Sequence, residues 1–239
     1  MNFLKKKALV RIGLGMALAL AFGISVQASN VTVNGSAWIN DSTGAQDAVI
    51  GNVPSSTPDV TFTVNTSTSL QFSSYFGAGS CGITCGNGGL SYTVGSFLAN
   101  GNPAATILTG SSSALANTLD NTIFEFTATV PITTGETFLV GHDDGASFYV
   151  DGNIIPGISP AGTSYVLTPI TYTGPNDPSA SLVMVYGEAF GAPAVFATNL
   201  PTGGGPTLTP EPSAFLLWGT GLGLLGLMLV SRRRKLFVS

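Results

Sequence analysis

Apolar and polar side chains alternate with a period of two along much of this chain, and this pattern limits the possible folds more than any other feature. It is clearest at residues 60–64, 124–130 and 170–173, where valine, phenylalanine, isoleucine or tyrosine alternates mainly with threonine. Such alternation places one face of a β-strand on a core and the other in water. At residues 182–186 the intervening positions are valines, which predicts a strand buried on both faces.

The segment between residues 30 and 200 contains no convincing amphipathic helix, and residues 45–57 and 111–121 are expected to be loops. Short strands with frequent Gly, Asn, Asp and Pro turns favour a sandwich or jelly roll. We therefore predict an all-β fold, a single antiparallel β-sandwich over residues 29–200. Because this segment has no lysine, its edge strands would have to be blunted by proline, loops or acidic residues.

The charges are divided sharply along the chain. All eight Lys and Arg residues lie in the two terminal segments, and none lies between Ser29 and Thr209. That middle part carries eight Asp and three Glu residues, which give a formal charge of −11. A domain without cations cannot neutralise phosphates, so nucleic-acid binding is excluded, whereas divalent cations would be attracted.

The N-terminus has the pattern of a signal peptide over residues 1–28. Four basic residues lie within the first eleven positions, and an apolar segment over residues 12–26 follows them. Small residues at Val26 and Ala28 suit a signal peptidase, with cleavage after Ala28. Export through the Sec machinery is the expected consequence, and a retained N-terminal anchor is the alternative.

The C-terminus carries a second apolar segment behind a linker of Gly, Pro and Thr at residues 201–209. Pro210, Glu211 and Pro212 come next, and the prolines prevent a helix or sheet from running through them. Residues 213–230 are uncharged and as a transmembrane helix would span roughly 27 Å. The basic tail consists of Arg232, Arg233, Arg234 and Lys235.

This order of a Pro-Glu-Pro box, a membrane helix and a basic tail resembles the PEP-CTERM protein-sorting signal of Gram-negative bacteria, over residues 210–239. The resemblance implies an exosortase-type membrane transpeptidase as partner. It also implies an inner-membrane-anchored precursor that later reaches the cell envelope, the cell surface or an exopolysaccharide-containing extracellular matrix. A plain stop-transfer helix is the alternative for this segment.

The two cysteines, Cys81 and Cys85, lie four residues apart in a glycine-rich stretch. In an oxidising compartment this spacing predicts a local disulfide. A metal site is the alternative, but it would need more ligands than this segment supplies.

The most ordered part of the sequence runs from Phe138 to Gly152. It predicts a strand at 138–142, a turn at Asp143-Asp144-Gly145, a strand at 146–150, and a tight Asp151-Gly152 hairpin. This succession resembles the PA14-type carbohydrate-binding and adhesin domains and the related fibro-slime repeats.

In lectin members of that family the adjacent aspartates bind Ca²⁺, which holds sugar hydroxyls, so the resemblance implies Asp143 and Asp144 as calcium ligands here. Calcium takes six to eight oxygens, so another loop would have to contribute. Glu188, Asn199 and Asp177 lie in candidate downstream loops. The alternative is a solvated hairpin turn in which both aspartates cap backbone amides.

No catalytic constellation is evident in the sequence. His142 is the only histidine and is expected to form structural hydrogen bonds at a strand end. Glu125 and Glu136 are expected to be solvated rather than to form the carboxylate pair of a glycosidase. We therefore expect a non-catalytic surface or matrix protein, not an enzyme; the alternative is a calcium-dependent carbohydrate-binding adhesin with polysaccharide as a partner.

Overall fold

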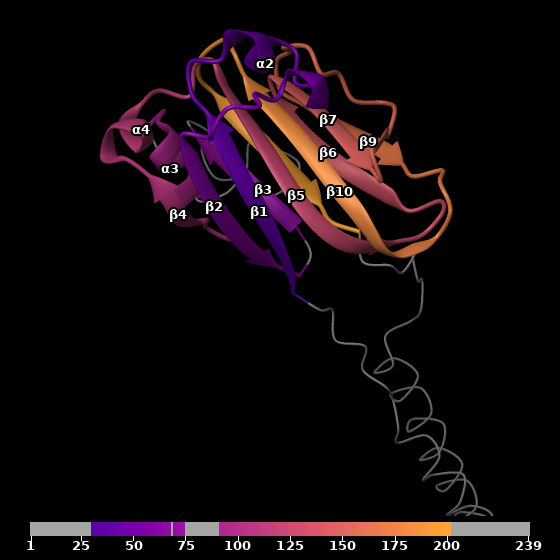
Figure 1. The fold of residues 1–239 in the computed structure, drawn as a ribbon. Coiled ribbons are helices and arrows are strands. Elements are labelled where there is room, and N and C mark those ends of the chain that lie inside the picture. The colour runs from indigo at the N-terminus through magenta and orange to yellow at the C-terminus, as the bar shows by residue number, and fades with distance from the viewer. Residues whose placement is uncertain (1–29, 68, 75–90, 202–239) are drawn as a thin grey trace, which may run out of the picture. The chain divides into compact units, whose positions relative to one another are not determined.

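Two antiparallel sheets, stacked in two layers, form the domain seen in the computed structural model, which describes residues 30–67, 69–74 and 91–201 (Figure 1). The larger sheet has seven strands, in the order β4 (Thr106–Gly110), β2 (Val60–Thr66), β1 (Val31–Trp38), β5 (Thr122–Ile132), β10 (Asp177–Glu188), β7 (Gly145–Val150) and β8 (Asn153–Ile154). The smaller sheet has four, in the order β3 (Ser69–Ser74), β11 (Ala194–Asn199), β6 (Thr137–Asp143) and β9 (Val166–Thr171). The predicted all-β sandwich is confirmed.

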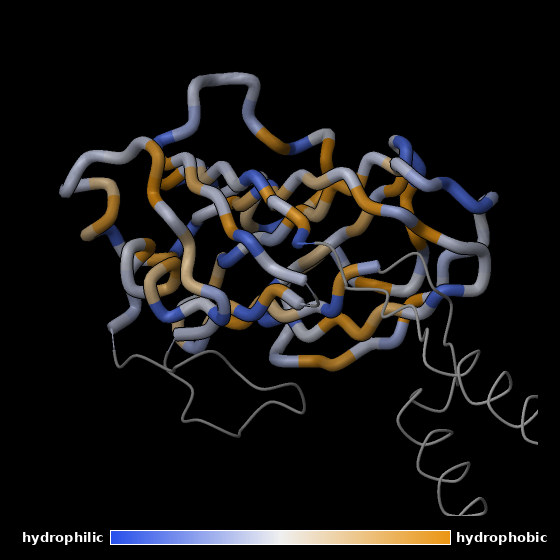
Figure 2. Tube along the Cα trace, turned by 90° about the horizontal axis from the view of Figure 1, so that it is seen from below, coloured by the Kyte–Doolittle hydropathy of each residue, from blue (hydrophilic) through white to orange (hydrophobic). Residues whose placement is uncertain are grey.

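The core between the sheets is built from the residues that the alternation singles out. Along β2 the side chains of Val60, Phe62 and Val64 are buried, while the threonines between them are partly exposed. Hydrophobic segments accordingly alternate with polar ones along the strands (Figure 2). Phe126 of β5 lies at the centre, with its ring centroid 4.9 Å from that of Phe196.

A second apolar cluster lies on the opposite face of the larger sheet. It consists of Trp38, Ala48, Ile123, Tyr149 and Val185. The segment at residues 39–58 packs against this face, as its hydrogen bonds record: Trp38 Nε1 donates to the Ser56 carbonyl at 2.9 Å, and the Ile50 N–H donates to Tyr149 Oη at 3.1 Å. We predicted that residues 182–186 form a strand buried on both faces. Val185 points away from the sandwich core and is nevertheless buried, because the 39–58 segment packs against this face.

Short helices lie between strands of the described residues, and all but the one at residues 94–99 overlap segments that we expected to be loops. They are α2 (Ser42–Gln46), the 3₁₀ turn η1 (Ile50–Asn52), α3 (Val94–Ala99) and α4 (Ser112–Ala116). The expectation of loops at 45–57 and 111–121 is therefore wrong in part. Each α-helix has five or six residues, too few to display a helical period, and each begins at a side-chain cap from Asp41, Thr93 or Ser111.

Within the described ranges, none of the helices has the length and apolarity needed to cross a membrane. The predicted signal peptide at 1–28, the sorting segment at 210–239 with its helix at 213–230, most of the linker, and Cys81 with Cys85 lie outside the described residues.

Candidate functional site

The link between β6 and β7 does not have the form that the sequence predicts. β6 pairs with β9 and β11 in the smaller sheet, whereas β7 pairs with β8 and β10 in the larger one. Asp144 is the single residue between the two strands, so the chain crosses there from one sheet to the other. The hairpin that we predicted at Asp143-Asp144-Gly145 is therefore absent, because each strand finds its partners elsewhere in the chain.

The next turn does follow the prediction. Asp151 and Gly152 have φ values of +51° and +78°, as a type I′ hairpin requires, and β7 pairs with β8 across them.

The crossing buries both aspartates, so the turn is not solvated, but the capping of backbone amides that the solvated-turn interpretation expected is present at Asp144. Asp143 is 8% exposed and Asp144 is 4% exposed. Asp144 Oδ2 accepts hydrogen bonds from the backbone N–H groups of Ala189 at 2.8 Å and Phe190 at 3.0 Å. The peptide bond between the two aspartates is cis. The carboxylate thus joins the crossing to the segment that follows β10.

A pocket of about 360 Å³ opens at this point on the surface. It is lined by Asp143, Asp144, Gly162, Thr163, Ser164, Phe190, Gly191, Ala192 and Pro193. Three segments distant in sequence therefore meet at the pocket: the β6–β7 crossing, the loop between β8 and β9, and the loop between β10 and β11.

Phe190 is the aromatic residue of the pocket, and its side chain is 69% exposed. Its ring lies against Gly162, since a Cβ on that glycine would come within 2.3 Å of the ring. A glycine is also required at Gly145, where a Cβ would stand 2.0 Å from the Pro160 carbonyl oxygen. These two glycines allow the 160–164 loop to close on the crossing and on the aromatic ring.

The two aspartates of the pocket are close enough for one to raise the pKa of the other. Burial, and secondarily the negative charge of Asp144, raises the pKa of Asp143 from 3.8 to about 6, while a backbone hydrogen bond from Tyr165 acts in the opposite direction. A divalent cation between the two carboxylates would relieve their repulsion.

A buried hydrogen-bond chain supports the crossing from behind. Tyr186 Oη lies 2.6 Å from Glu188 Oε2 and also hydrogen-bonds to the Asp143 carbonyl, and Tyr92 Oη lies 2.8 Å from Glu188 Oε1. A phenol has one proton and a carbonyl only accepts. If Tyr186 donates to the Asp143 carbonyl, it therefore accepts from a protonated Glu188.

The protonation of Glu188 agrees with its surroundings. The side chain is fully buried, and burial raises its pKa from 4.5 to about 9; the nearby Asp144 and Asp143 also raise the pKa, while hydrogen bonding with the two tyrosines lowers it. Glu188 is thus a neutral acid near pH 7. It supports the backbone of the crossing and is absent from the lining of the pocket.

His142 is also buried beside the crossing. Its Nδ1 lies 2.6 Å from the Asp144 carbonyl, an acceptor, so Nδ1 carries the proton. Nε2 is buried and has no hydrogen-bond partner among the described residues. Burial lowers the pKa of the imidazole. The ring thus holds the Asp144 backbone from the interior.

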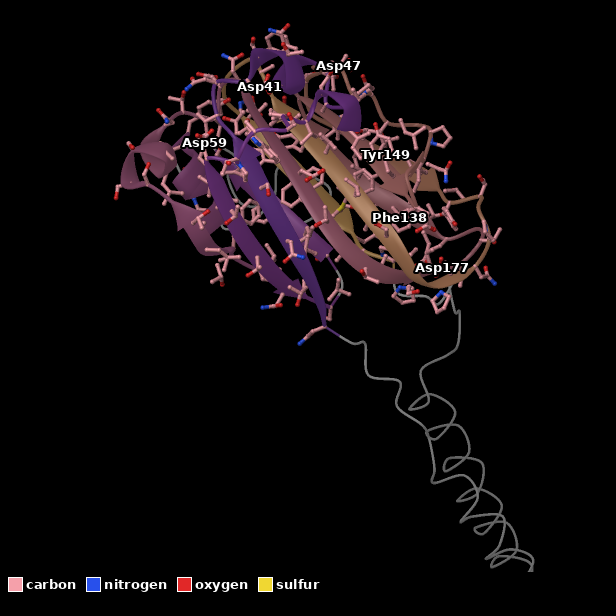
Figure 3. All side chains as sticks on the ribbon, viewed as in Figure 1. Asp41, Asp47, Asp59, Phe138, Tyr149 and Asp177 are labelled. Carbon is pink, nitrogen blue, oxygen red and sulfur yellow. The ribbon has the colours of Figure 1, made fainter. Side chains whose placement is uncertain are left out.

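The other two sequence candidates for calcium ligands lie away from the pocket. Asp177 begins β10 and Glu188 ends it, so about 36 Å of strand separates them. Figure 3 labels Asp177 at the end of the domain opposite to Asp41 and Asp47. Asn199 Oδ1 accepts from the Leu139 N–H at 2.5 Å, near the start of β6. Within the described part of the chain, no group of three or more His, Cys, Asp or Glu side chains is arranged to hold a metal ion.

The two glutamates that we expected to be solvated are less exposed than predicted. Glu136 is 6% exposed, and its Oε2 accepts from the Thr133 N–H at 3.1 Å, so it closes the turn before β6. Glu125 is half-buried in β5, and burial raises its pKa. Glu125 lies near the start of β5 and Glu136 lies in the turn beyond its end, so the two form no carboxylate pair.

Sequence reasoning missed Phe190 as a pocket residue, and it missed Tyr92 and Tyr186 as partners of Glu188. For Phe190 a signal existed, since it is a lone aromatic residue in the small-residue run Ala189-Phe190-Gly191-Ala192. No local signal links Tyr92 to Glu188, because 96 residues separate them.

No protein-family model matches the chain, and no curated protein matches it. Among solved structures, the PA14 domain of the antifreeze protein MpAFP is similar with a TM-score of 0.40 and 16% identity, over 78% of this chain and 90% of that one. The PA14 sugar-binding domain of an RTX adhesin has a TM-score of 0.41 and 18% identity, over 70% and 86% of the two chains. A β-glucosidase from Kluyveromyces marxianus has a TM-score of 0.24 and 14% identity, over 55% of this chain and 16% of that one. We therefore base the functional assignment on the pocket itself.

Proposed function

We propose that this chain is an exported, non-catalytic surface protein whose β-sandwich binds carbohydrate hydroxyls at the Asp143–Asp144 pocket through a calcium ion. The observation that carries the binding proposal is the pocket itself, which combines two adjacent carboxylates with one exposed aromatic ring. Ligand sites of this kind pair an apolar surface with a few polar groups that fix orientation.

The donor groups around the pocket suit calcium in kind. Asp144 Oδ2 is occupied by two backbone amides, which leaves Oδ1 and the Asp143 carboxylate as anionic oxygens. Thr163 and Ser164, whose side chains carry hydroxyl oxygens, belong to the same lining. Calcium takes six to eight oxygens, so backbone groups, water or the sugar itself would complete the set. When bound, the ion would supply open positions for vicinal hydroxyl oxygens.

Phe190 supplies the second half of the proposed site. Its exposed ring offers an apolar surface for the carbon face of a sugar ring, while the ion would take the hydroxyl groups. The two contributions can be separated by mutation because Phe190 carries no ligand atom. The Phe190 backbone N–H, which holds Asp144, is retained whatever the side chain.

Calorimetry of the full chain in detergent micelles tests the calcium step. Calcium should release or absorb heat on binding to the unaltered protein. The double substitution Asp143→Asn with Asp144→Asn should weaken the affinity for calcium about tenfold or more, which corresponds to a loss of ~1.4 kcal/mol in binding free energy. Asp177→Asn is the matched control, because it removes one charge at the far end of β10. Absence of binding at millimolar calcium would overturn the proposal.

The carbohydrate step has its own measurement. Retention of the calcium-loaded chain on immobilised polysaccharide should be lost on adding a chelator, and Phe190→Ala should lose retention while still binding calcium. Retention that is the same with and without chelator would contradict the role of calcium.

The export and sorting proposal rests on the two terminal segments. Replacing Pro210, Glu211 and Pro212 with alanine should trap the full-length precursor in the inner membrane, as intact-mass analysis of membrane and surface fractions would reveal. Unchanged processing would reduce this segment to a spacer before an ordinary anchor.

A further inference from the structure

The four edge strands of the sandwich differ in how they are protected from pairing with another chain. In the larger sheet the edges are β4 and β8, and in the smaller sheet they are β3 and β9. β8 has two residues, β9 contains Pro169, and five of the six residues of β3 are buried. Shortness, proline and coverage are the usual protections of an edge. The prediction that edges would be blunted by proline, loops or acidic residues therefore holds for β9, whereas β8 is protected by its shortness and β3 by its burial.

β4 lacks all three protections. It has five residues with no proline and no charge, and every one of them is exposed. Ile107 is 37% exposed and Leu108 is 59% exposed. β4 pairs with β2 on one side, and outside that ladder no backbone hydrogen bond between described residues begins or ends on residues 106–110.

A bulge shapes this edge. Thr61 pairs with Thr109 and Phe62 with Ile107, so Leu108 has no partner residue on β2. The bulge limits a further ladder to a few residues. A strand of five residues also buries far less than the roughly 1,200 Å² of a stable interface, so any pairing at this edge is weak and reversible.

The charge distribution indicates which partner can approach β4. Residues 60–119 contain no Asp, Glu, Lys, Arg or His, whereas residues 29–209 as a whole carry a formal charge of −11. β2, α3, β4 and α4, which belong to this uncharged stretch, lie together at one end of the domain (Figure 1). Asp59, which directly precedes Val60 and is labelled near this end in Figure 3, is the charged residue beside these elements, so two copies of the chain should repel each other least when they meet here.

We propose that β4 is a self-association edge, where two copies of this chain pair antiparallel about a twofold axis and pack Ile107 and Leu108 against the same residues of the other copy. An isologous contact of this kind needs a patch that is complementary to itself. A neutral, apolar strand edge satisfies that condition. A cationic partner would instead be drawn to the acidic surface elsewhere on the domain.

Sedimentation equilibrium of the full chain in density-matched detergent tests the proposal. The unaltered chain should show a reversible dimer over a concentration series, and Leu108→Glu and Leu108→Lys should each abolish it, because like charges then meet across the axis. An equal mixture of the two variants should restore dimers. Ile154→Glu, an equally exposed apolar residue on β8, is the matched control and should dimerise like the unaltered chain.

Salt and folding controls complete the experiment. Raising the salt from about 0.01 M to about 0.5 M should strengthen the dimer, since it screens the repulsion between the two acidic copies. Unchanged melting temperatures would show that the variants are folded. A monomer at every concentration would overturn the proposal, as would dimers that persist in both Leu108 variants, which would place the contact elsewhere in the chain.

Discussion

The pocket region and the stretch of residues 60–119 are built from opposite kinds of side chain. The first holds Asp143, Asp144 and Glu188, all buried, and the second has no charged residue at all. Hydrogen bonds between buried polar groups hold the pocket region in place, whereas aromatic packing, as at Phe72, holds much of the other, which joins the first through the hydrogen bond between Tyr92 and Glu188. The comparison teaches that pH and charge substitutions should act mainly on the first region and should reach the second through Tyr92, since both share one core.

The largest expected effect tests whether the two regions unfold together. Phe126 stacks on Phe72 from the uncharged stretch and on Phe196 from the other end of the chain. Phe126→Ala should lower the free energy of unfolding by about 3–5 kcal/mol through the cavity it leaves. Urea denaturation of the full chain measures this loss. Phe190→Ala, an exposed phenylalanine, should change stability by less than about 0.5 kcal/mol. Two separate transitions in Phe126→Ala would divide the domain into independent halves.

The next effect concerns the buried acid behind the pocket. Glu188→Ala should cost about 1–3 kcal/mol, because it leaves the hydroxyls of Tyr92 and Tyr186 buried without their partner. Glu188→Gln should cost much less, since its amide group can donate to Tyr186 and its carbonyl can accept from Tyr92. Urea denaturation of both variants gives the comparison. Equal losses in the two variants would show that shape, rather than a donated proton, is what this position requires.

The pH dependence of stability should originate in the pocket region. The folded-state pKa of Glu188 is raised from 4.5 to about 9, so the folded protein binds more protons than the unfolded chain between these values. Its contribution to stability is complete below pH 4.5 and is lost as the pH rises toward 9. The lowered pKa of His142 acts in the opposite sense, but only below its ordinary value of 6.5.

The change in stability between pH 7 and pH 9 should therefore come from the titration of Glu188. The melting temperature of the unaltered chain should fall across this interval, and that of Glu188→Gln should fall less. A melting temperature that rises, or an equal slope in both proteins, would assign the titration to another group. Circular dichroism provides the measurement.

The smallest expected effect compares a helix cap outside both regions with one in the uncharged stretch. Asp41 Oδ1 accepts from the N–H groups of Thr43 and Gly44 at 3.1 Å, and Ser111 Oγ accepts from the Ala114 N–H at 3.1 Å. Asp41→Ala should cost about 1 kcal/mol and Ser111→Ala about half of that, within the range known for caps. The same urea titration measures both, and the reverse order would show that the number of capped amides does not set the cost.

The parts of this fold that could be predicted are those determined by the spacing of neighbouring residues. The alternation at residues 60–64 and 124–130 identified β2 and β5, and Asp151-Gly152 identified a hairpin, because strand faces and turn dihedrals depend on neighbouring residues. The crossing at Asp144 was not predictable, because it depends on which distant strands β6 and β7 pair with. The short helices were missed because a helix of five residues carries no readable period.

The candidate site was predictable to a similar extent. Asp143 and Asp144 were identified by a motif, and the pocket contains them. Asp177 and Asn199 were proposed as further ligands from sequence order alone, and the strand geometry places both at a distance from the pocket. Phe190 and residues 162–164 line the pocket because three connections between strands meet there. No single segment of the sequence indicates that they meet.

The position of β11 has a consequence for when this domain can form during synthesis. β11 is the last of the described strands, yet it stands inside the smaller sheet, between β3 and β6. β3 pairs with no other described strand, so from residue 74 onward it must wait for residues 194–199. A nascent chain that emerges N-terminus first therefore lacks a closed second layer until nearly all of the domain has been made. All strands of the larger sheet precede β11 in the chain, so the arrival of β11 closes the second layer against a first layer whose strands have already been made.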